Sequence, residues 1–202
     1  MKKYSQYEED VFLSSFFKNL KNGFVVDIGA ADGISNSNSR FLIESGWSAL
    51  LVEPNKKNFK NLELLYFNSG NIILENLGCS KNNISDAEFY IDQNDEYEQL
   101  STFNPEQVNK CKKMYNCEFI TDKVNLIKTS ELFKKHSIKK IDFLSVDTES
   151  FDTDVILGID LNDCDISLIC VEHTSDLLFD ILKKHEYIIV NKTIGNTFFS
   201  KK

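Results

Sequence analysis

Short, almost fully apolar runs alternate along this chain with segments in which apolar residues recur every three or four positions. Apolar runs of this length bounded by turn residues indicate buried strands, and the recurrence indicates amphipathic helices. The alternation predicts an α/β fold, a parallel sheet with helices on both faces. The expected strands are 24–29, 49–53, 71–75, 141–146 and 166–171. The expected helices are 5–19, 36–45, 129–135, 151–157 and 175–184, with a further helix after Pro54 that runs through Phe59, Leu62, Leu65 and Tyr66.

The two ends of the chain extend this pattern. The helix over 5–19 carries acids in its first turn, where the helix dipole favours them, and an apolar stripe formed by Val11, Leu13, Phe16, Phe17 and Leu20. At the other end, residues 187–194 and 197–200 flank Gly195-Asn196, which is typical of a hairpin turn. An antiparallel hairpin therefore closes the otherwise parallel sheet.

The segment 81–128 interrupts the alternation. It is polar, holds one of the two prolines, and contains short strand-like pieces at 87–91, 118–120 and 124–127 with a small helix around 105–115. We interpret it as an insertion beside the site, a candidate lid, within a single domain that covers residues 1–202.

Composition narrows the function classes. The net charge of −8 argues against nucleic acid as a partner, because phosphate binding needs a basic stripe. No apolar run approaches the length of a membrane span, and no apolar segment follows the basic start as in a secretory signal. The five cysteines never form Cys-x-x-Cys, which argues against structural zinc and fits reduced thiols in a cytoplasmic protein.

The most informative stretch is VVDIGAADG at 25–33, a buried strand that delivers a turn with Gly29 and Gly33. Glycines let a ligand approach the backbone amides. The spacing is neither the dinucleotide Gly-x-Gly-x-x-Gly nor a P-loop. Asp27 and Asp32 would repel a pyrophosphate and would suit a ligand that carries an ammonium and a sulfonium. We therefore expect S-adenosylmethionine and S-adenosylhomocysteine to bind, and NAD not to bind; a plain strand-to-helix turn is the alternative.

A second signal is LLVEP at 50–54. Glu53 stands at the tip of the second strand, about 20 residues past the glycine turn, where an acid can take both ribose hydroxyls. Asn76 and Leu77 follow the third strand, where an adenine edge would lie.

Several motifs together resemble the FkbM family of S-adenosylmethionine-dependent methyltransferases. They are SQYEED at 5–10, GFVVDIGAADG at 23–33, SNS at 37–39, GWSALLVEP at 46–54, IDFLSVDTES at 141–150 and ICVEH at 169–173. The resemblance implies a Rossmann-like class I methyltransferase fold, a doubly wound, mostly parallel seven-stranded sheet with the C-terminal hairpin. It also implies S-adenosylmethionine as donor and an oxygen acceptor on a sugar or a similar small molecule.

The resemblance carries donor binding over to Asp27, Gly29, Asp32 and Glu53. The complete expected donor set is Asp27, Gly29, Ala30, Asp32, Gly33, Asn38, Glu53, Pro54, Asn76 and Leu77. The family usually has Asp-x-Glu-Gly-x-Glu where this chain has Asp147-Thr148-Glu149-Ser150-Phe151-Asp152. Ser150 thus replaces a turn glycine, and this departure bears on the acceptor site.

The acceptor side is expected where the fourth strand ends in Asp147 and Glu149 and the fifth in Glu172 and His173. The predicted catalytic residues are Asp147, Glu149 and His173, with His173 or Asp147 as the general base that takes a hydroxyl proton. Equally, Asp147, Glu149 and Glu172 could hold a divalent cation that acidifies the hydroxyl. The third possibility is that these acids only cap helix N-termini.

The leading hypothesis is an O-methyltransferase that acts on a sugar, a glycan or a similar small molecule. The alternatives are a catalytically inactive donor-binding scaffold and, on weaker grounds, a nucleotide-cofactor oxidoreductase. The sequence leaves open whether the protein forms a homodimer. His136 and His185 are expected on the surface, and Trp47 in packing.

Overall fold

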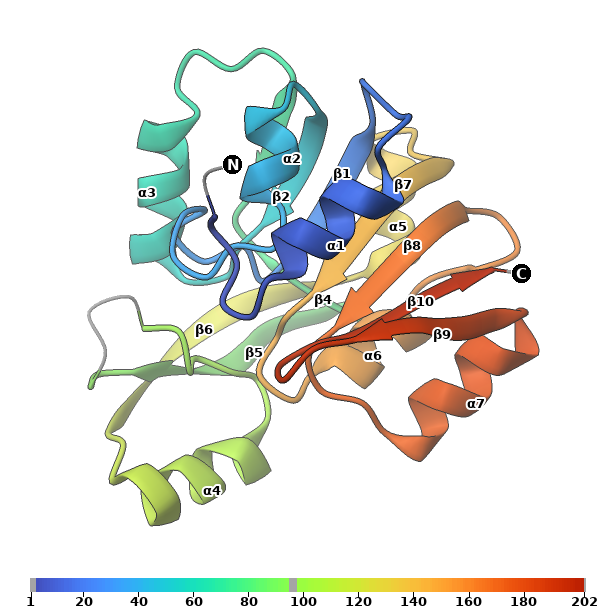
Figure 1. The fold of residues 1–202 in the computed structure, drawn as a ribbon. Helices are drawn as coiled ribbons and strands as arrows, with labels where there is room; N and C mark the ends of the chain where they lie inside the picture. Colours follow the sequence, from blue (N-terminus) through green and yellow to red (C-terminus); the bar gives the residue numbers. More distant parts are fainter. Residues whose placement is uncertain (1–2, 95–97, 202) are drawn as a thin grey trace.

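The computed structural model describes residues 3–94 and 98–201 and is organised around a seven-stranded sheet (Figure 1). The strand order is β3-β2-β1-β7-β8-β10-β9. The strands are β1 (Phe24–Ile28), β2 (Ser48–Val52), β3 (Ile72–Glu75), β7 (Lys140–Val146), β8 (Asp165–Val171), β9 (Tyr187–Lys192) and β10 (Thr197–Lys201).

The pairing directions confirm the expected mixed sheet. Strands β3, β2, β1, β7 and β8 pair in parallel, whereas β10 pairs antiparallel with both β8 and β9. The chain order reverses between β1 and β7, because the chain goes from β1 to β2 on one side and returns to β7 on the other. In open α/β sheets the crevice at such a reversal, outside the carboxyl ends of the strands, is where ligands bind.

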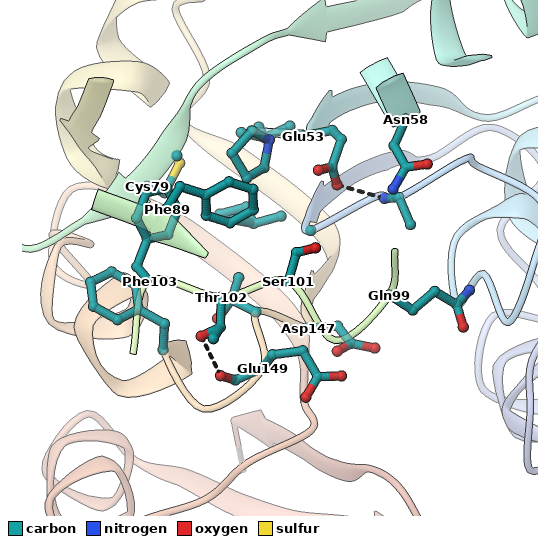
Figure 2. Close-up of a pocket in the computed structure, with 18 of the residues that line it drawn as sticks. Glu53, Asn58, Cys79, Phe89, Gln99, Ser101, Thr102, Phe103, Asp147 and Glu149 are labelled. Carbon is teal, nitrogen blue, oxygen red and sulfur yellow. Dashed lines mark hydrogen bonds between the residues drawn. The ribbon is translucent and has the colours of Figure 1, made fainter. Parts of the chain in front are cut away.

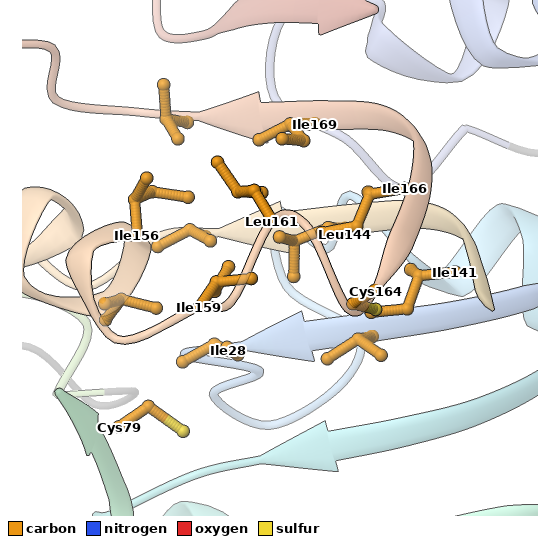
Figure 3. Packing of buried hydrophobic residues seen from close by; sticks show 14 of the residues in the cluster. Ile28, Cys79, Ile141, Leu144, Ile156, Ile159, Leu161, Cys164, Ile166 and Ile169 are labelled. Atoms are coloured by element: carbon orange, nitrogen blue, oxygen red, sulfur yellow. The ribbon is translucent and has the colours of Figure 1, made fainter. Parts of the chain in front are cut away.

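Helices cover both faces of the sheet, as the doubly wound prediction requires (Figure 1). One core joins Leu13, Leu42 and Leu62 to the strand residues of that face, and the other joins Leu132 and Val155 to the opposite face. Figure 3 shows part of this second core, with Ile28, Ile156 and Ile169 among its members. The helices of the first face are α1 (Glu9–Phe16), α2 (Arg40–Glu44) and α3 (Lys56–Leu65), and those of the second are α5 (Thr129–Lys135), α6 (Asp152–Leu157) and α7 (Asp176–Lys184). Alternate residues of each strand thus enter two separate cores.

The N-terminal helix is shorter than predicted. Helix α1 begins at Glu9 rather than residue 5, because Glu8 has the left-handed φ of 68° and the Asp10 carboxylate accepts hydrogen bonds from the Tyr4 and Ser5 amides. Of the predicted apolar stripe, Leu13 and Phe17 are buried, whereas the others are exposed: Val11, Phe16 and Leu20. Local periodicity could not show that this segment folds back on itself.

Helix α2 is also shorter than the predicted 36–45. Asn36 has a φ of 56°, and the Ser37 hydroxyl accepts a hydrogen bond from the Arg40 amide, so residues 36–39 form a turn that leads into the helix. This turn places Asn38 and Ser39 beside the glycine loop instead of on a helix face.

The insertion has its own small sheet. Strands β4 (Gly78–Ser80), β5 (Ile84–Asp92) and β6 (Phe119–Lys128) pair in the order β4-β6-β5, and α4 (Pro105–Tyr115) precedes β6. The two strand pieces expected at 118–120 and 124–127 are one continuous strand, β6. The lid role stays a prediction, and residues 95–97 of this segment lie outside the described residues.

The insertion is attached to the loop that follows β7. The Thr102 hydroxyl donates a hydrogen bond to the Glu149 backbone carbonyl at 2.7 Å. The Asn104 side-chain amide donates to the Ser150 backbone carbonyl at 3.1 Å. The Phe103 and Phe151 rings lie 5.6 Å apart. The insertion therefore shapes the same edge of the sheet at which β7 ends.

Three smaller expectations can be checked directly. Trp47 is buried in packing against Phe17, as expected. His136 is not a plain surface residue: its side chain is 18% exposed, and its Nε2 lies 2.6 Å from the Glu75 carboxylate. All five cysteines are buried and free.

Every helix of the described chain falls short of the length and apolarity that a membrane crossing requires.

The loop after β7 keeps the backbone of a glycine turn although it has no glycine. Glu149 and Ser150 have φ values of 51° and 70°, both in the left-handed region that side chains other than glycine disfavour. Ser150 therefore preserves the turn and stores strain in it.

We expect Ser150→Gly to stabilise the protein. Relief of the left-handed strain, of about 1–2 kcal/mol, exceeds the roughly 0.5–1 kcal/mol of extra chain entropy that glycine loses on folding. The melting temperature should rise by a few degrees, at about 2–4 °C per kcal/mol. Ser45→Gly is the matched control, because Ser45 has a φ of −84° and gains nothing from glycine. A melting temperature that rises equally in both variants, or in neither, contradicts the prediction.

Candidate functional site

Two adjoining cavities lie at the carboxyl ends of β1, β2 and β7. The wide one has a volume of about 700 Å³ and the narrow one about 50 Å³. Residues that line both are Gly29, Ala31, Gln99, Asp147 and Glu149. The narrow cavity also has apolar walls, formed by Ile28, Val52, Leu77, Phe89, Phe103 and Phe151 (Figure 2). An elongated ligand with an apolar end and a polar end fits this pair of cavities.

The glycine turn after β1 sets how close the neighbouring loops come. Gly29 has a φ of 93°, and a Cβ atom at this position would lie 1.8 Å from the Asp147 carbonyl oxygen. The Gly29 and Ala30 amides donate to the Val52 carbonyl at 2.9 and 3.1 Å. No other residue type fits at position 29, so the turn is built for close approach.

Two buried polar side chains face the wide cavity from this region. The Asp27 carboxylate accepts a hydrogen bond from the Ser39 hydroxyl at 2.5 Å, and burial raises the pKa of Asp27 to about 6. Asn38 is 5% exposed, and its Oδ1 atom has no hydrogen-bond partner among the described residues. A buried acceptor of this kind costs stability unless a ligand supplies the donor.

Glu53 has the position that the sequence predicted, at the end of β2 and in the wall of the narrow cavity. One carboxylate oxygen accepts from the Ala31 backbone amide at 2.8 Å and the other from the Asn55 backbone amide at 2.7 Å. Burial raises the pKa of Glu53 to about 7 in spite of these bonds. Glu53 therefore joins the glycine turn to the start of α3 as well as facing the cavity.

Three residues of the expected donor set lie elsewhere. Within the described part of the chain, neither cavity is lined by Asp32, Gly33 or Asn76. The Asp32 carboxylate accepts from the Ile34 and Ser35 amides, and a Cβ at Gly33 would meet Leu62 at 2.6 Å. The Asn76 amide donates to the Glu53 carbonyl at 2.8 Å. These three residues thus bond or pack within the loops, and their contact with the donor stays a prediction.

The other expected donor residues do line the cavities. Asp27, Ala30 and Asn38 line the wide one, Glu53, Pro54 and Leu77 the narrow one, and Gly29 both.

The expected acceptor-side residues converge as predicted. Asp147, Glu149, Glu172 and His173, from the ends of β7 and β8, all line the wide cavity. His173 Nδ1 lies 2.7 Å from a Glu172 carboxylate oxygen. One ligand atom from each of Glu149, Glu172 and His173 lies within 4.8 Å of the others, so these three could hold a cation.

The carboxyls of this group raise one another's pKa values. Burial, and then the charge of Glu172, hold the pKa of Asp147 well above its usual value and raise that of Glu149 to about 8. Burial raises the pKa of Asp152 to about 6. The close approach of the Glu172 carboxylate to Nδ1 raises the pKa of His173. The described lining of both cavities includes no Lys or Arg that could offset these acids.

Sequence reasoning missed what the insertion contributes to the site. The Phe89 and Phe103 rings lie 4.6 Å apart in the wall of the narrow cavity, and the Gln107 amide donates to the Glu149 carboxylate at 3.2 Å. The available signal was that Phe89 and Phe103 are two of the three phenylalanines in an otherwise polar segment. Their partners are far away in sequence, so no local pattern could identify them.

Comparison with known proteins agrees with this geometry. A family model described as "Methyltransferase FkbM domain" matches residues 27–189. That range includes the glycine turn, Glu53 and the whole acid-rich group. Among curated protein sequences nothing matches the chain.

Solved methyltransferase structures share the fold. A putative methyltransferase, yhhF, from Escherichia coli aligns with a TM-score of 0.50 and 12% identity, over 100% of this chain and 89% of that one. Streptococcus pneumoniae Sp1610, a putative tRNA (m1A22) methyltransferase, aligns with a TM-score of 0.50 and 9% identity, over 97% and 70%. Aeropyrum pernix fibrillarin with natively bound S-adenosyl-L-methionine aligns with a TM-score of 0.48 and 10% identity, over 94% and 73%.

We expect Glu53→Ala to weaken binding of S-adenosylhomocysteine by about 1.5–3 kcal/mol, the range for hydrogen bonds to a charged group. Titration calorimetry measures this as a roughly 10- to 150-fold rise in Kd. Glu75→Ala is the matched control, because Glu75 also ends a strand but pairs with Lys135 and His136 and lines neither cavity. An unchanged Kd in Glu53→Ala would show that Glu53 is only a strand-end residue.

The raised pKa values predict that the ligand-free protein loses stability as the pH rises. Asp27, Glu53 and Glu149 hold their protons more tightly when folded, so the folded chain binds more protons between about pH 4.5 and 8. The melting temperature should therefore fall between pH 5 and 8 at constant ionic strength. Glu53→Gln should reduce this fall, and Glu63→Gln, on the exposed face of α3, should leave it unchanged. A melting temperature that rises across this range would contradict the assignment.

Proposed function

The chain belongs to the FkbM methyltransferase family and is an S-adenosylmethionine-dependent methyltransferase; on that premise we propose that it methylates a hydroxyl of a sugar, a glycan or a similar small molecule. One observation carries the proposal about the acceptor. The His173–Glu172 pair lies among carboxyls in the wide cavity, directly beside the glycine turn. A hydroxyl is a weak nucleophile, and its methylation calls for a group that removes its proton.

The residues present fit the donor. Among the described residues Asn38 Oδ1 is a buried acceptor without a partner, and Asp27 is a buried carboxylate in a cavity whose described lining includes no Lys or Arg, so both suit an ammonium. Glu53 suits a pair of ribose hydroxyls, and the walls that Phe89 and Phe103 form suit a flat ring. When bound, S-adenosylmethionine supplies a methyl group activated by its sulfonium.

His173 is the proposed general base. Glu172 lies against Nδ1, which favours the tautomer with the proton on that nitrogen and leaves Nε2 to accept the hydroxyl proton. Glu172 then stabilises the imidazolium that forms, in the same way as the acid of a catalytic triad. The position of the pair, rather than a large pKa change, supports this role.

Asp147 and Glu149 have a different proposed role. Burial raises the pKa of Glu149 to about 8, so near neutral pH this carboxyl retains its proton and can donate a hydrogen bond to an acceptor oxygen; burial raises the pKa of Asp147 in the same direction. Groups that orient two reactants can contribute as much as a base, roughly 7–11 kcal/mol for ideal alignment. We propose that these two residues orient the acceptor hydroxyl next to His173.

The alternative is assistance by a divalent cation. The approach of Glu149, Glu172 and His173 within 4.8 Å supports it. In that case His173 binds the cation instead of a proton, and the bound hydroxyl is acidified by the metal charge. An inactive scaffold is the further alternative, and the left-handed φ of Ser150 counts against it because the turn keeps its shape without glycine.

We expect His173→Ala to lower turnover by ~10²–10⁴-fold while binding of S-adenosylhomocysteine is preserved. Turnover is measured as methyl transfer from labelled S-adenosylmethionine to a panel of methyl glycosides and oligosaccharides. His136→Ala is the matched control, because His136 forms a similar pair with Glu75 but lines neither cavity. Turnover of the unmodified protein should fall as the pH drops through the pKa of His173, which is raised above its ordinary 6.5.

A chelator separates the two mechanisms. Full turnover in EDTA supports the base, whereas loss in EDTA and recovery with Mg²⁺ support the cation. If His173→Ala keeps full turnover and EDTA has no effect, both mechanisms fail, and catalysis rests on positioning or on a base from residues 81–128. Donor binding without transfer to any acceptor of the panel would favour the scaffold.

A further inference from the structure

A buried carboxylate in α1 connects two segments that lie at opposite ends of the sequence. Glu9 is fully buried. One of its carboxylate oxygens accepts from the Thr193 hydroxyl at 2.6 Å and from the Asn196 side-chain amide at 3.0 Å, and the other accepts from the Tyr7 amide at 2.8 Å. Burial raises the pKa of Glu9, but the hydrogen bonds from Thr193 and Asn196 outweigh it, so the pKa lies below its ordinary value. Glu9 therefore stays ionised and bonded near neutral pH.

The turn between β9 and β10 is organised around this carboxylate. The Thr193 amide donates to the Asn196 carbonyl at 2.8 Å, and the Asn196 amide donates to the Thr193 hydroxyl at 3.0 Å. The Thr193 and Asn196 side chains, which are the hydrogen-bonding side chains of this turn, thus both point toward the Glu9 carboxylate. Ile194 and Gly195 are left at the tip, where the Ile194 side chain is 87% exposed.

The two segments touch through Tyr7. A Cβ atom at Gly195 would lie 2.8 Å from the Tyr7 ring, so the ring packs directly on the glycine. Figure 1 shows the loop before α1 running next to the tip of the β9–β10 hairpin. The absence of a side chain at position 195 is what allows this contact.

This joined surface lines one cavity and not the other. Gln6, Tyr7, Ile194 and Gly195 all line the wide cavity, which also contains His173. Within the described residues none of the four lines the narrow cavity. The surface therefore lies in the cavity that contains the proposed base, a cavity that the donor residues Asp27 and Asn38 also line.

We infer that residues 5–10 and 193–196 form one wall of the acceptor site, in which Tyr7 and Ile194 determine acceptor specificity and Glu9 is the positioning residue that holds both segments. The inference rests on the proposed function, and it gives a role to the SQYEED motif, to which the sequence assigned none. The wall offers an aromatic ring and an aliphatic side chain, whereas Asp147, Glu149 and His173 in the same cavity are polar. This combination suits a ring with one apolar face and several hydroxyls, as in a sugar.

The first test is independent of the acceptor. In Glu9→Gln one carboxylate oxygen is replaced by an NH₂ group, which is a donor. Both oxygens of Glu9 accept hydrogen bonds, so in either orientation of the glutamine amide this NH₂ group faces another donor and at least one of the bonds is lost. Amides of Tyr7 and residues 193–196 should exchange hydrogen at least about tenfold faster in S-adenosylhomocysteine-bound protein, whereas amides of residues 25–33 should not change. Glu8→Gln is the matched control, because Glu8 belongs to the same motif but is exposed and pairs with Lys3.

The second test measures the specificity of the wall. With the acceptor that the glycoside panel identifies, Tyr7→Ala and Ile194→Ser should raise the acceptor KM by about tenfold, the equivalent of one lost apolar contact. Gly195→Ala should act similarly, because its methyl group displaces the Tyr7 ring while Glu9 is left intact. In all three variants the donor KM and the Kd of S-adenosylhomocysteine should stay within about twofold of the original.

The outcomes distinguish the inference from the proposed function. Unchanged exchange at 193–196 in Glu9→Gln shows that Glu9 does not hold the wall, and a large loss of S-adenosylhomocysteine affinity shows that the wall serves the donor; either result overturns the inference. An unchanged acceptor KM in Tyr7→Ala overturns the specificity role. If no acceptor on the panel is methylated, the proposed function fails, and the exchange and affinity measurements still decide whether Glu9 holds a wall on the acceptor side.

Discussion

The contact between the Gly29 backbone and the Asp147 carbonyl is the constraint on which the rest of the site depends. These residues follow β1 and β7, the neighbouring strands at which the chain order of the sheet reverses. The loops after them leave toward opposite sides, and a Cβ at position 29 would lie 1.8 Å from the Asp147 oxygen. Because glycine allows the approach, the end of β1 that carries Asp27 and the loop that carries Glu149 open into one cavity. Methyl transfer requires its two reactants to be adjacent, and this contact makes the two halves of the site adjacent.

The buried acids at this site lower the stability of the protein when no ligand is bound. Burial raises the pKa values of Asp27, Glu53 and Glu149, and the described cavity lining includes no Lys or Arg. A fold that retains buried carboxyls without cations gives up stability, and such groups are more common at functional sites than elsewhere. A cationic donor that binds there restores part of that stability, because its positive charge stabilises the buried carboxylates. The same acids disfavour a pyrophosphate, which agrees with a methyltransferase rather than a nucleotide-dependent oxidoreductase on this fold.

The sequence was sufficient where the determinant is local. Periodicity located the parallel strands and the C-terminal hairpin, and the strand-end position of Glu53 placed its carboxylate in the cavity wall. The sequence was insufficient where one side chain could either contact a ligand or support its own loop. The sequence offered Asp32 as a ligand contact, which stays a prediction, and did not show that its carboxylate accepts two amides of its own turn. It was also insufficient for contacts distant in sequence, such as Thr102 with Glu149 and Glu9 with Thr193, because no pattern within either segment encodes the other.

The arrangement divides the site into a part that the sheet fixes and a part that peripheral segments supply. Glu53 and Gly29 stand at the ends of paired parallel strands, so their positions follow from strand register and cannot shift without disrupting the core. Tyr7, Ile194 and Gln99 come from the N-terminal loop, the hairpin tip and the insertion, which lie at the periphery of the sheet. Changes in these segments leave the hydrophobic cores intact. A methyltransferase built this way can keep its donor site while its acceptor changes, and for that reason the donor was readable from the motifs whereas the acceptor has to be inferred from the walls of the cavity.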